Sequence, residues 1–462
     1  MKVAVIGTGY VGLITGTCLA EIGNEVICID KDSKKIEKLN KGITPIYEEY
    51  LEDMVTRNIL EGRLSFTASI KEGIEFASVV FIAVGTPSQE NGDADLSQVD
   101  AAAKEIAHSM KDYKVIVNKS TVPVGTNHKV KNIIKMYSTK HVLFDVVSNP
   151  EFLREGRAIY DIFNADRIII GSSSKRAAQI LQELYQPLHQ EIFVTSPESA
   201  EMIKYASNAF LATKISFINE IANICENVGA DVSEVAKGMG MDKRIGNKFL
   251  NAGIGFGGAC FPKDVKALIK IAESNQYDFK IIKQTLAVNE RQKQKPIEFL
   301  ERIFTNLQDV KIGILGLAFK PGTDDIREAP AITIIQELMK RGAIIKAYDP
   351  IAMDNMKSKL EASIEYCNDC YDAMKDCDAV LLLTEWDEFM NLDMHKAARL
   401  MNKKILIDGR NMLDSEKATK MGFKYYGIGK GIPLNERVYF LNERMIFDES
   451  EESNYPRCRA WN

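Results

Sequence analysis

The chain has 462 residues, of which 45% are hydrophobic and 27% charged, and its formal net charge is −5. This length suits two or three domains, and this composition excludes a largely disordered or fibrous protein. Because charges of both signs are interspersed, the chain lacks the basic field that nucleic-acid binding needs, so we expect no nucleic acid as partner.

The first 30 residues predict a strand, a helix and a second strand around a glycine motif. Residues 2–7 and 25–30 are short apolar runs, and residues 13–23 between them have apolar residues at helical spacing. The turn GTGYVG connects the first run to the helix, which is the structural context of the dinucleotide fingerprint. The sequence therefore predicts a βαβ unit that binds a dinucleotide.

Four residues of this unit have predicted roles in cofactor binding. Gly7 permits the tight turn, Gly9 lets the backbone approach a pyrophosphate, and Gly12 allows close packing of the helix. Asp30 ends the second strand, where a carboxylate accepts the ribose hydroxyls of NAD and repels the extra phosphate of NADP. NADP stays open as an alternative because of three nearby lysines, namely Lys31, Lys34 and Lys35.

Three further apolar strands end in loops, at residues 78–87, 114–126 and 144–156. Open α/β sheets bind ligands at such carboxyl-end loops, although turn formation alone also explains several of the loop residues, namely Thr86, Pro87, Thr121 and Pro123. In the last loop Glu151 and Glu155 are four residues apart and could line one face. A solvated helix start explains that spacing equally well.

A long helix is predicted from Ser199 to Asn227, where apolar residues recur at helical spacing before Gly229. Lys204 and Asn208 are four residues apart and share a face of this helix. The flanking apolar residues could desolvate Lys204 and give it a catalytic role, but an ordinary surface lysine is the alternative.

One cysteine follows a glycine-dense loop whose glycines are residues 253, 255, 257 and 258. Such glycines indicate sharp turns or close approach to a ligand. Lys263 and a helix start at Pro262 could favour the thiolate of Cys260, and Asp264 could exchange protons beside it. A thiolate that traps an aldehyde as a thiohemiacetal permits a second oxidation to a thioester, whereas the alternative is a small buried thiol.

A second α/β set is predicted from residue 310, and its first loop carries Lys320 and Arg327, which could engage phosphates. Cys367 and Cys370 form a lone CxxC without a second pair, so we expect no metal site, with zinc as the weaker alternative. The tail from Asp448 is polar, so we expect it to be poorly ordered and Cys458 to be non-catalytic. These patterns divide the chain into domains at 1–198, 199–300 and 301–450, with a polar tail at 451–462.

The location of the protein is predicted from what the sequence contains. No apolar run reaches the roughly 18 residues of a membrane span, so we expect no membrane partner. The regularly placed glycines of the N-terminus indicate mature structure and not a secretory signal. Eight scattered cysteines are typical of reduced thiols, so we expect a cytoplasmic protein.

The motifs of this chain, taken together, match those of a known family. They are GTGYVG, STVPVGT, NPEFLREG, KYASNAF, RIGNKFLNAGIGFGGACFPKD and GLAFKPGTDDIREAP. On them, and over nearly its whole length, the chain closely resembles the UDP-glucose/GDP-mannose dehydrogenase family. The resemblance implies an α/β fold with two Rossmann-like doubly wound domains, joined by a central all-helical dimerisation domain with a long connecting helix.

The resemblance also implies a reaction and a set of site residues. UDP-glucose would be oxidised to UDP-glucuronate with two NAD and one water, by a homodimer or larger homo-oligomer. The implied catalytic residues are Cys260, Lys204, Asn208, Asp264, Glu151 and Thr121. The implied NAD contacts are Gly7, Gly9, Tyr10, Val11, Gly12, Asp30, Lys35, Thr86, Pro87, Thr121, Glu155, Lys263 and Arg327. The implied substrate contacts are Glu151, Phe152, Leu153, Arg154, Glu155, Lys204, Asn208, Arg244 across the dimer interface, Phe249, Leu250, Asn251, Gly253, Gly255, Phe256, Gly257 and Lys320.

Four alternative functions remain at this point. GDP-mannose 6-dehydrogenase and UDP-N-acetylmannosamine dehydrogenase share the thiol mechanism, and general physics does not identify the nucleotide base. A simple 3-hydroxyacid dehydrogenase performs one oxidation and needs no cysteine, so the GGACFPKD stretch argues against it. A non-catalytic NAD-binding sensor is the fourth, and it would tolerate the loss of Cys260.

Overall fold

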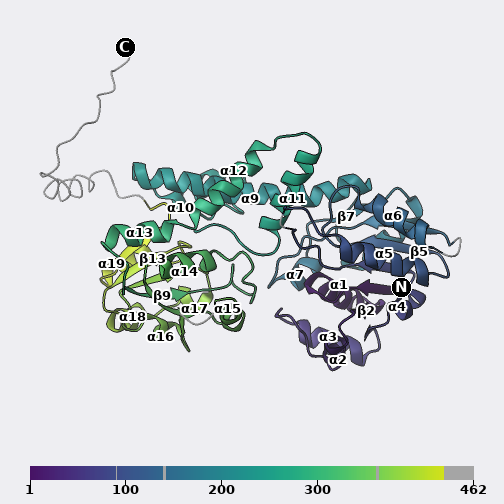
Figure 1. Ribbon diagram of the computed structural model, residues 1–462, viewed down its shortest axis with the longest axis horizontal. Coiled ribbons are helices and arrows are strands. Elements are labelled where there is room, and N and C mark those ends of the chain that lie inside the picture. Colours follow the sequence, from purple (N-terminus) through teal and green to yellow (C-terminus); the bar gives the residue numbers. More distant parts are fainter. Residues whose placement is uncertain (90, 139–141, 361–363, 431–462) are drawn as a thin grey trace, which may run out of the picture.

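The computed structural model describes residues 1–89, 91–138, 142–360 and 364–430. Two α/β lobes lie at the ends of an elongated molecule, and a group of helices runs between them (Figure 1). The polar tail and Cys458 lie outside the described residues. The fold class predicted from the sequence is confirmed, since each lobe contains one sheet and the connection between the lobes is helical.

The N-terminal lobe is built on an eight-stranded sheet in the order β3-β2-β1-β4-β5-β6-β7-β8. Its strands are parallel except for the single antiparallel bridge between Ser148 of β6 and Gly171 of β7. The strands are β1 Lys2–Ile6, β2 Glu25–Ile29, β3 Leu64–Thr67, β4 Val79–Ile82, β5 Lys114–Asn118, β6 Phe144–Ser148, β7 Ile168–Gly171 and β8 Ile192–Thr195.

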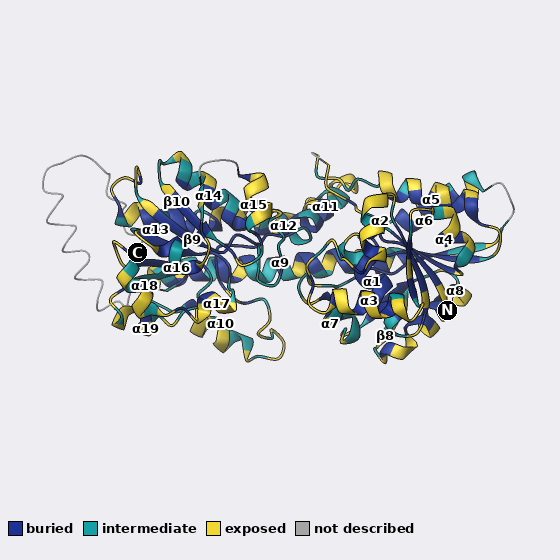
Figure 2. Cartoon of the chain, turned by 90° about the horizontal axis from the view of Figure 1, so that it is seen from below, coloured by how far each residue is buried: buried dark blue, intermediate teal, exposed yellow. Residues whose placement is uncertain are grey.

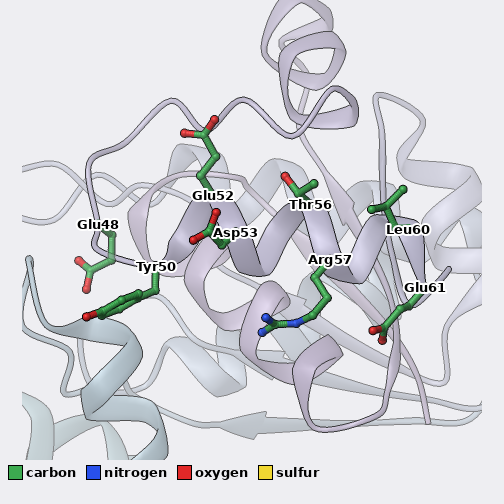
Figure 3. Close-up of a pocket in the computed structure, with 8 residues that line it drawn as sticks. All are labelled: Glu48, Tyr50, Glu52, Asp53, Thr56, Arg57, Leu60 and Glu61. Carbon is green, nitrogen blue, oxygen red and sulfur yellow. The ribbon is translucent and has the colours of Figure 1, made fainter.

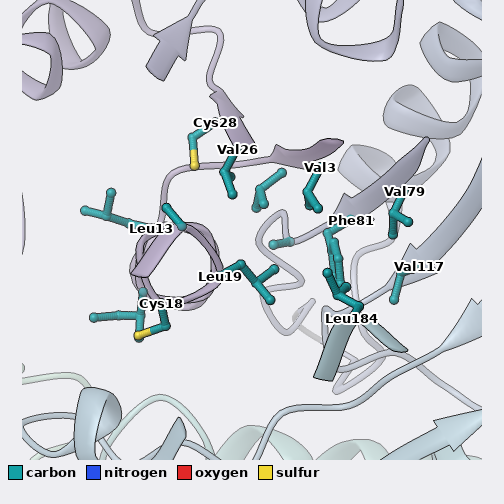
Figure 4. Packing of buried hydrophobic residues seen from close by; sticks show 14 of the residues in the cluster. Val3, Leu13, Cys18, Leu19, Val26, Cys28, Val79, Phe81, Val117 and Leu184 are labelled. Carbon is teal, nitrogen blue, oxygen red and sulfur yellow. The ribbon is translucent and has the colours of Figure 1, made fainter. Parts of the chain in front are cut away.

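Two apolar cores cover the two faces of this sheet, as the alternation along β1 requires. Val3 and Val5 face one core and Ala4 and Ile6 the other, because successive side chains of a strand point to opposite faces. Figure 4 shows the first core, in which Cys18 and Cys28 are buried. The helices of this lobe are α1 Tyr10–Glu21, α2 Ser33–Asn40, α3 Leu51–Leu60, α4 Ile70–Phe76, α5 Ser97–Ser109, α6 Thr126–Tyr137, α7 Ala158–Phe163 and α8 Lys175–Tyr185, followed by a 3₁₀ turn at Gln186–Leu188.

The long helix predicted from residue 199 is confirmed as α9, Pro197–Val228. Its start is fixed by Ser196, whose side chain accepts from the Ser199 N–H, and its end by Gly229 in the left-handed conformation. Near its middle α9 packs against α11, and near its end Ala222 and Cys225 enter the core of the second lobe. The other central helices are α10 Val232–Gly240, α11 Phe261–Ser274, α12 Lys280–Gln292 and α13 Lys295–Ile303.

The C-terminal lobe contains a fully parallel six-stranded sheet in the order β11-β10-β9-β12-β13-β14. Buried strands fill the centre of both lobes, and exposed residues gather on the outer helices (Figure 2). The strands are β9 Lys311–Leu315, β10 Ile344–Tyr348, β11 Ile364–Tyr366, β12 Ala379–Leu382, β13 Ile405–Asp408 and β14 Lys424–Gly427. The helices are α14 Pro330–Lys340, α15 Met353–Lys359, α16 Cys370–Met374, α17 Asp387–Met390, α18 Met394–Leu400 and α19 Ser415–Lys420.

The segment after Glu151 is not helical. The spacing left two interpretations open, one face shared by Glu151 and Glu155 or a solvated helix start, and neither holds as a helix, because residues 151–154 are irregular and α7 begins only at Ala158. Cys367 and Cys370 are buried in an apolar core, and the described residues contain no group of three or more His, Cys, Asp or Glu that could hold a metal ion. Among the helices that the structure describes, none is long and apolar enough to cross a membrane.

Candidate active site

The three fingerprint glycines have the surroundings that dinucleotide binding requires. Gly7 has a φ of 100°, and a Cβ there would lie 2.6 Å from the carbonyl oxygen of Ala83. A Cβ on Gly12 would lie 1.9 Å from the carbonyl oxygen of Gly7, so only glycine lets α1 approach the turn. Gly9 is different because nothing lies within 4 Å of its Cβ position, and it is the N-cap of α1 without a side-chain cap. The start of α1 is therefore open to a phosphate.

Asp30 is held as a carboxylate at the end of β2. Its Oδ2 accepts hydrogen bonds from the Thr8 hydroxyl at 2.7 Å and from Lys35 Nζ at 2.8 Å. Burial opposes ionisation, but Lys35 and Thr8 outweigh it and lower the pKa of Asp30 to about 2. Because Lys35 is paired with Asp30, it is less available to bind the 2′-phosphate of NADP.

The predicted lysine of α9 forms a buried ion pair with the 151–157 loop. Lys204 Nζ lies 2.9 Å from Glu151 Oε1, and the two side chains are only 4% and 6% exposed. Burial disfavours both charges, but each residue stabilises the charged form of the other. The pKa of Lys204 is therefore raised and the pKa of Glu151 is lowered. The second carboxylate oxygen of Glu151 accepts from the Leu153 N–H at 2.6 Å.

A second polar group joins α9 to the start of α11. Asp264 is buried and accepts from Asn208 Nδ2 at 2.7 Å and from Lys263 Nζ at 2.5 Å. Asn208 lies one helical turn beyond Lys204, as its spacing predicted. The structure therefore brings Lys204, Asn208 and Asp264 to one part of α9.

Cys260 lies at the N-cap of α11, so the predicted helix start beside it is confirmed. The expectation that Lys263 favours the thiolate is wrong, because Lys263 pairs with Asp264. Burial, and then the carboxylate of Glu151, raise the pKa of Cys260 to about 12, against the opposing charge of Lys204. The resting side chain is thus a thiol that must lose its proton when it reacts.

A cavity of about 780 Å³ connects these groups. Of the predicted site residues, those that line it are Glu151, Phe152, Leu153, Arg154, Lys204, Asn208, Phe249 and Cys260. The rest of the glycine loop lies deeper: Gly253 is packed against the carbonyl of Gly409, and Gly257 against that of Glu328. Leu250, Gly255 and Phe256 are likewise buried, whereas Asn251 is exposed.

A cluster at the boundary of the lobes contains three further charged residues of the predicted site, Glu155, Lys320 and Arg327. Arg327 Nη2 lies 2.7 Å from Asp325 and 3.3 Å from Glu155 Oε1. Burial and the neighbouring Asp325 raise the pKa of Glu155 to about 7. Burial also lowers the pKa of Lys320, on the same loop of the C-terminal lobe. The 151–157 loop therefore contacts both lobes.

Several predicted residues lie apart from the cavity in this single chain. Arg244 is 89% exposed and pairs with Asp242. The Thr86 hydroxyl donates to the Thr121 carbonyl at 2.8 Å, which ties two carboxyl-end loops together beside Pro87. Tyr10 follows Gly9 on α1 beside Val11, and its hydroxyl donates to Glu48.

Two residues near the ion pair were missed by the sequence analysis. Lys119 lines the cavity, is buried, and donates to Asn149 Oδ1 at 3.1 Å. Burial lowers the pKa of Lys119 to about 8, while the charges of Glu151 and Lys204 act on it in opposite directions. Both residues directly follow buried strands, β5 and β6, which is the signal that could have identified them.

A second hollow, of about 570 Å³, lies on α3 (Figure 3). Its lining is mainly acidic, with Glu48, Glu52, Asp53 and Glu61 against the one cation Arg57 among its eight residues. Such a surface repels a diphosphate, so the first cavity is the better site for an anionic ligand.

Three family models match successive parts of the chain. They describe the NAD binding domain, the central domain and the UDP binding domain of the UDP-glucose/GDP-mannose dehydrogenase family, at residues 1–189, 198–291 and 313–415. The chain belongs to this family, as its motifs indicated.

Individual relatives are similar over almost the full length. UDP-glucose 6-dehydrogenase TuaD of Bacillus subtilis (strain 168) is 53% identical over 429 residues, which are 93% of either chain. The solved structure of a UDP-glucose dehydrogenase from Pyrobaculum islandicum has a TM-score of 0.87 and 38% identity, and covers 92% of this chain and 97% of its own. A UDP-D-ManNAc dehydrogenase from Pyrococcus horikoshii has a TM-score of 0.82 and 29% identity, with 93% and 99% covered.

Proposed function

We propose that this chain is an NAD-dependent dehydrogenase that oxidises the C6 hydroxyl of UDP-glucose to the carboxylate of UDP-glucuronate. The observation that carries the proposal is the position of Cys260, which lines the same cavity as Lys204 and lies at the start of α11. A thiol in that place allows one enzyme to oxidise an alcohol twice.

The reaction balances over four steps. In each of the two oxidations the substrate carbon loses a hydride, for which NAD would be the acceptor when bound, and the oxygen on that carbon loses a proton; the first acts on the alcohol and the second on the thiohemiacetal. Between them Cys260 Sγ adds to the aldehyde carbon, and the thiol proton passes to the former carbonyl oxygen. Finally water attacks the thioester, the C–S bond breaks, and Cys260 regains a proton as the carboxylate leaves.

Each neighbouring side chain has a role in these steps. Lys204 supplies a buried positive charge where oxygen becomes negative, and Asn208 supplies a hydrogen-bond donor beside it. Glu151, ionised and next to Lys204, is suited to accept a proton through water. Because burial raises the pKa of the Cys260 thiol, we propose that its proton leaves only as the carbon–sulfur bond forms. Asp264 assists in proton and water handling, and Thr121, which lies apart from the cavity, is given the same role only by its resemblance to the family motif.

The nucleotide sugar is assigned by similarity. The relative named UDP-glucose 6-dehydrogenase is 53% identical, whereas the UDP-D-ManNAc dehydrogenase is 29% identical. The family's UDP binding domain covers residues 313–415, which include Lys320 and Arg327. GDP-mannose and UDP-N-acetylmannosamine therefore remain second candidates.

The test is the yield of NADH per sugar, with limiting UDP-glucose, GDP-mannose or UDP-N-acetylmannosamine supplied separately beside excess NAD. We expect two NADH per UDP-glucose and little from the other two. One NADH per sugar would refute the thiohemiacetal route, and no NADH from any of them would favour the sensor.

We further propose that the protein is a homodimer that pairs through α9. Phe210, Phe217 and Ile224 are exposed on this helix and seven residues apart, so they form one apolar row with Val228 close by. Phe210 also lines the cavity, so a second copy on this row would add to the cavity wall. Lys214 donates to the Ile245 carbonyl at 3.1 Å, which keeps Arg244 near the row and suits it for the partner's substrate.

One substitution and a matched control test pairing through α9. Phe217→Glu places a charge in the row and should convert the dimer to a monomer in sedimentation or light-scattering experiments. Met136→Glu changes an exposed apolar residue on α6, which is more exposed than Phe217, and should leave the dimer intact. A wild-type monomer, or a Phe217→Glu dimer, would refute pairing through α9.

The domain limits and the location are proposals as well. We propose domains at 1–198, 199–300 and 301–450, supported by the end of the first sheet at Thr195 and the start of the second at Lys311. The seven cysteines within the described residues are free thiols, which supports a cytoplasmic location.

A further inference from the structure

The backbone of the 151–157 loop is fixed by carboxylates and not by regular secondary structure. Glu151 accepts from the Leu153 N–H, and Asp161 accepts from the Arg154 N–H at 2.9 Å. The third carboxylate, Glu48, is more than a hundred residues away in sequence. It accepts from the Gly156 N–H at 2.8 Å and from the Ala158 N–H at 2.7 Å.

Glu48 also binds the first residue of α1. The Tyr10 hydroxyl donates to Glu48 Oε2, the same oxygen that accepts from Gly156, and the Gly156 N–H lies 2.9 Å from the Tyr10 hydroxyl. One carboxylate thus joins the helix that follows the cofactor turn to the loop of Glu151 and Glu155. Figure 3 shows Glu48 just before α3, at one end of the hollow on that helix.

The backbone at Gly156, where Glu48 binds the loop, is tightly packed. Gly156 has a φ of 77°, and a Cβ there would lie 2.3 Å from the carbonyl oxygen of Gly322 in the C-terminal lobe. The loop is therefore held by Glu48 on one side and by the second lobe on the other. Glu48 itself is 8% exposed, so its hydrogen bonds are shielded from water and hold the backbone firmly.

We propose that Glu48 is a positioning residue for nucleotide-sugar oxidation, which fixes the 151–157 loop to α1 so that Glu151 meets Lys204 and Glu155 meets Arg327. This inference rests on the proposed function. It assigns Glu48 no contact with the reacting atoms, and it makes the Tyr10 hydroxyl part of the same anchor.

Glu48→Gln is the sharpest test because it preserves size. One amide oxygen remains to accept a backbone hydrogen bond, but the amide NH₂ group now faces a backbone N–H and two donors oppose each other. We expect kcat/KM for UDP-glucose to fall roughly 10- to 100-fold, the loss that small displacements of catalytic groups produce. The dissociation constant of NADH, measured by fluorescence, should rise by a smaller factor than kcat/KM falls, because Gly7, Gly9 and Asp30 are untouched and only the implied contacts near Glu48 are displaced.

Tyr10→Phe removes only the hydroxyl and should lower kcat/KM in the same direction by a smaller factor, so it also serves if Glu48→Gln does not fold. Its matched control is Tyr113→Phe. The Tyr113 hydroxyl donates to Asp145 at 2.8 Å, also a tyrosine–carboxylate bond of this lobe, but next to the amino ends of β5 and β6. Tyr113→Phe should leave kcat/KM unchanged.

Amide hydrogen exchange gives a readout that needs no substrate. In Glu48→Gln the peptide that contains Gly156 and Ala158 should exchange faster, while the peptide around Asp145 should not. Unchanged exchange there would overturn the anchoring, and faster exchange with wild-type kcat/KM would overturn the positioning role. A wild-type protein that makes no NADH from any nucleotide sugar would instead refute the proposed function and leave the exchange result valid.

Discussion

The buried pair of Lys204 and Glu151 predicts an asymmetric response to removal of its two partners. Glu151→Gln leaves the ammonium groups of Lys204 and Lys119 near each other without their carboxylate. Lys204→Met leaves Glu151 with Lys119, whose charge also acts on it. The loss of the carboxylate should therefore destabilise the protein more than the loss of the lysine.

The magnitude follows from the geometry. For unit charges 2.9 Å apart and an effective dielectric constant of about 20, the Coulomb energy is roughly 6 kcal/mol. Loss of one partner of a buried pair costs about 3–5 kcal/mol in measured cases, and we expect Glu151→Gln to fall in that range in urea unfolding. The control is Glu37→Gln, which breaks the fully exposed pair with Lys41 and should cause no measurable change.

The difference in the free energy of unfolding between the wild type and Glu151→Gln should depend on pH, and its sign can be worked out. Burial is the largest influence on Lys204 and lowers its pKa, while Glu151 and then Asp264 raise it. Without Glu151 we expect burial to outweigh Asp264, so that the variant regains stability as pH rises and the lysine releases its proton. In the wild type the pKa of Glu151 is lowered, so its contribution is lost as pH falls. The difference in unfolding free energy between the two proteins should thus be largest near neutral pH. A loss for Lys204→Met as large as that for Glu151→Gln, or a gap that grows in alkali, would refute this reasoning.

Two further predictions concern the chemistry and the cofactor. Cys260→Ala should abolish UDP-glucuronate formation and leave the dissociation constant of NADH nearly unchanged, as product analysis and fluorescence titration would measure; full acid production would contradict the covalent route. The wild type should prefer NAD to NADP in kcat/KM, and Asp30→Ala should narrow that preference by removing the carboxylate that repels the 2′-phosphate; equal efficiency of the wild type with both cofactors would disprove this role of Asp30.

The parts of the fold that sequence predicted are those that depend on short-range patterns. Alternating burial along β1, the fingerprint glycines and the apolar spacing of α9 are local properties, and the structure follows them. The irregular backbone after Glu151 could not be predicted in this way, because the conformation is fixed by Glu48, from a distant segment.

The residues of the site could be predicted from the sequence more easily than their ion-pair partners and the directions of their pKa shifts. Spacing placed Lys204 and Asn208 on one face of a helix, but the partner of each came from another segment, Glu151 for Lys204 and Asp264 for Asn208. The pKa of Cys260 depends on burial, which the printed sequence does not show, so proximity to Lys263 gave the wrong direction. Glu48 lies in the stretch ITPIYEEYLED, where no local spacing indicates a partner more than a hundred residues away.

Helix α9 limits the insertions and deletions that this sequence can accept during evolution. It contacts the first sheet near its start, holds Lys204 and Asn208 in the middle, and enters the core of the second lobe near its end. Each residue inserted between Asn208 and Ala222 would turn the second lobe by about 100° and shift it by about 1.5 Å relative to the first. The number of residues in this stretch therefore sets the angle between the lobes, and an insertion or deletion there would change that angle.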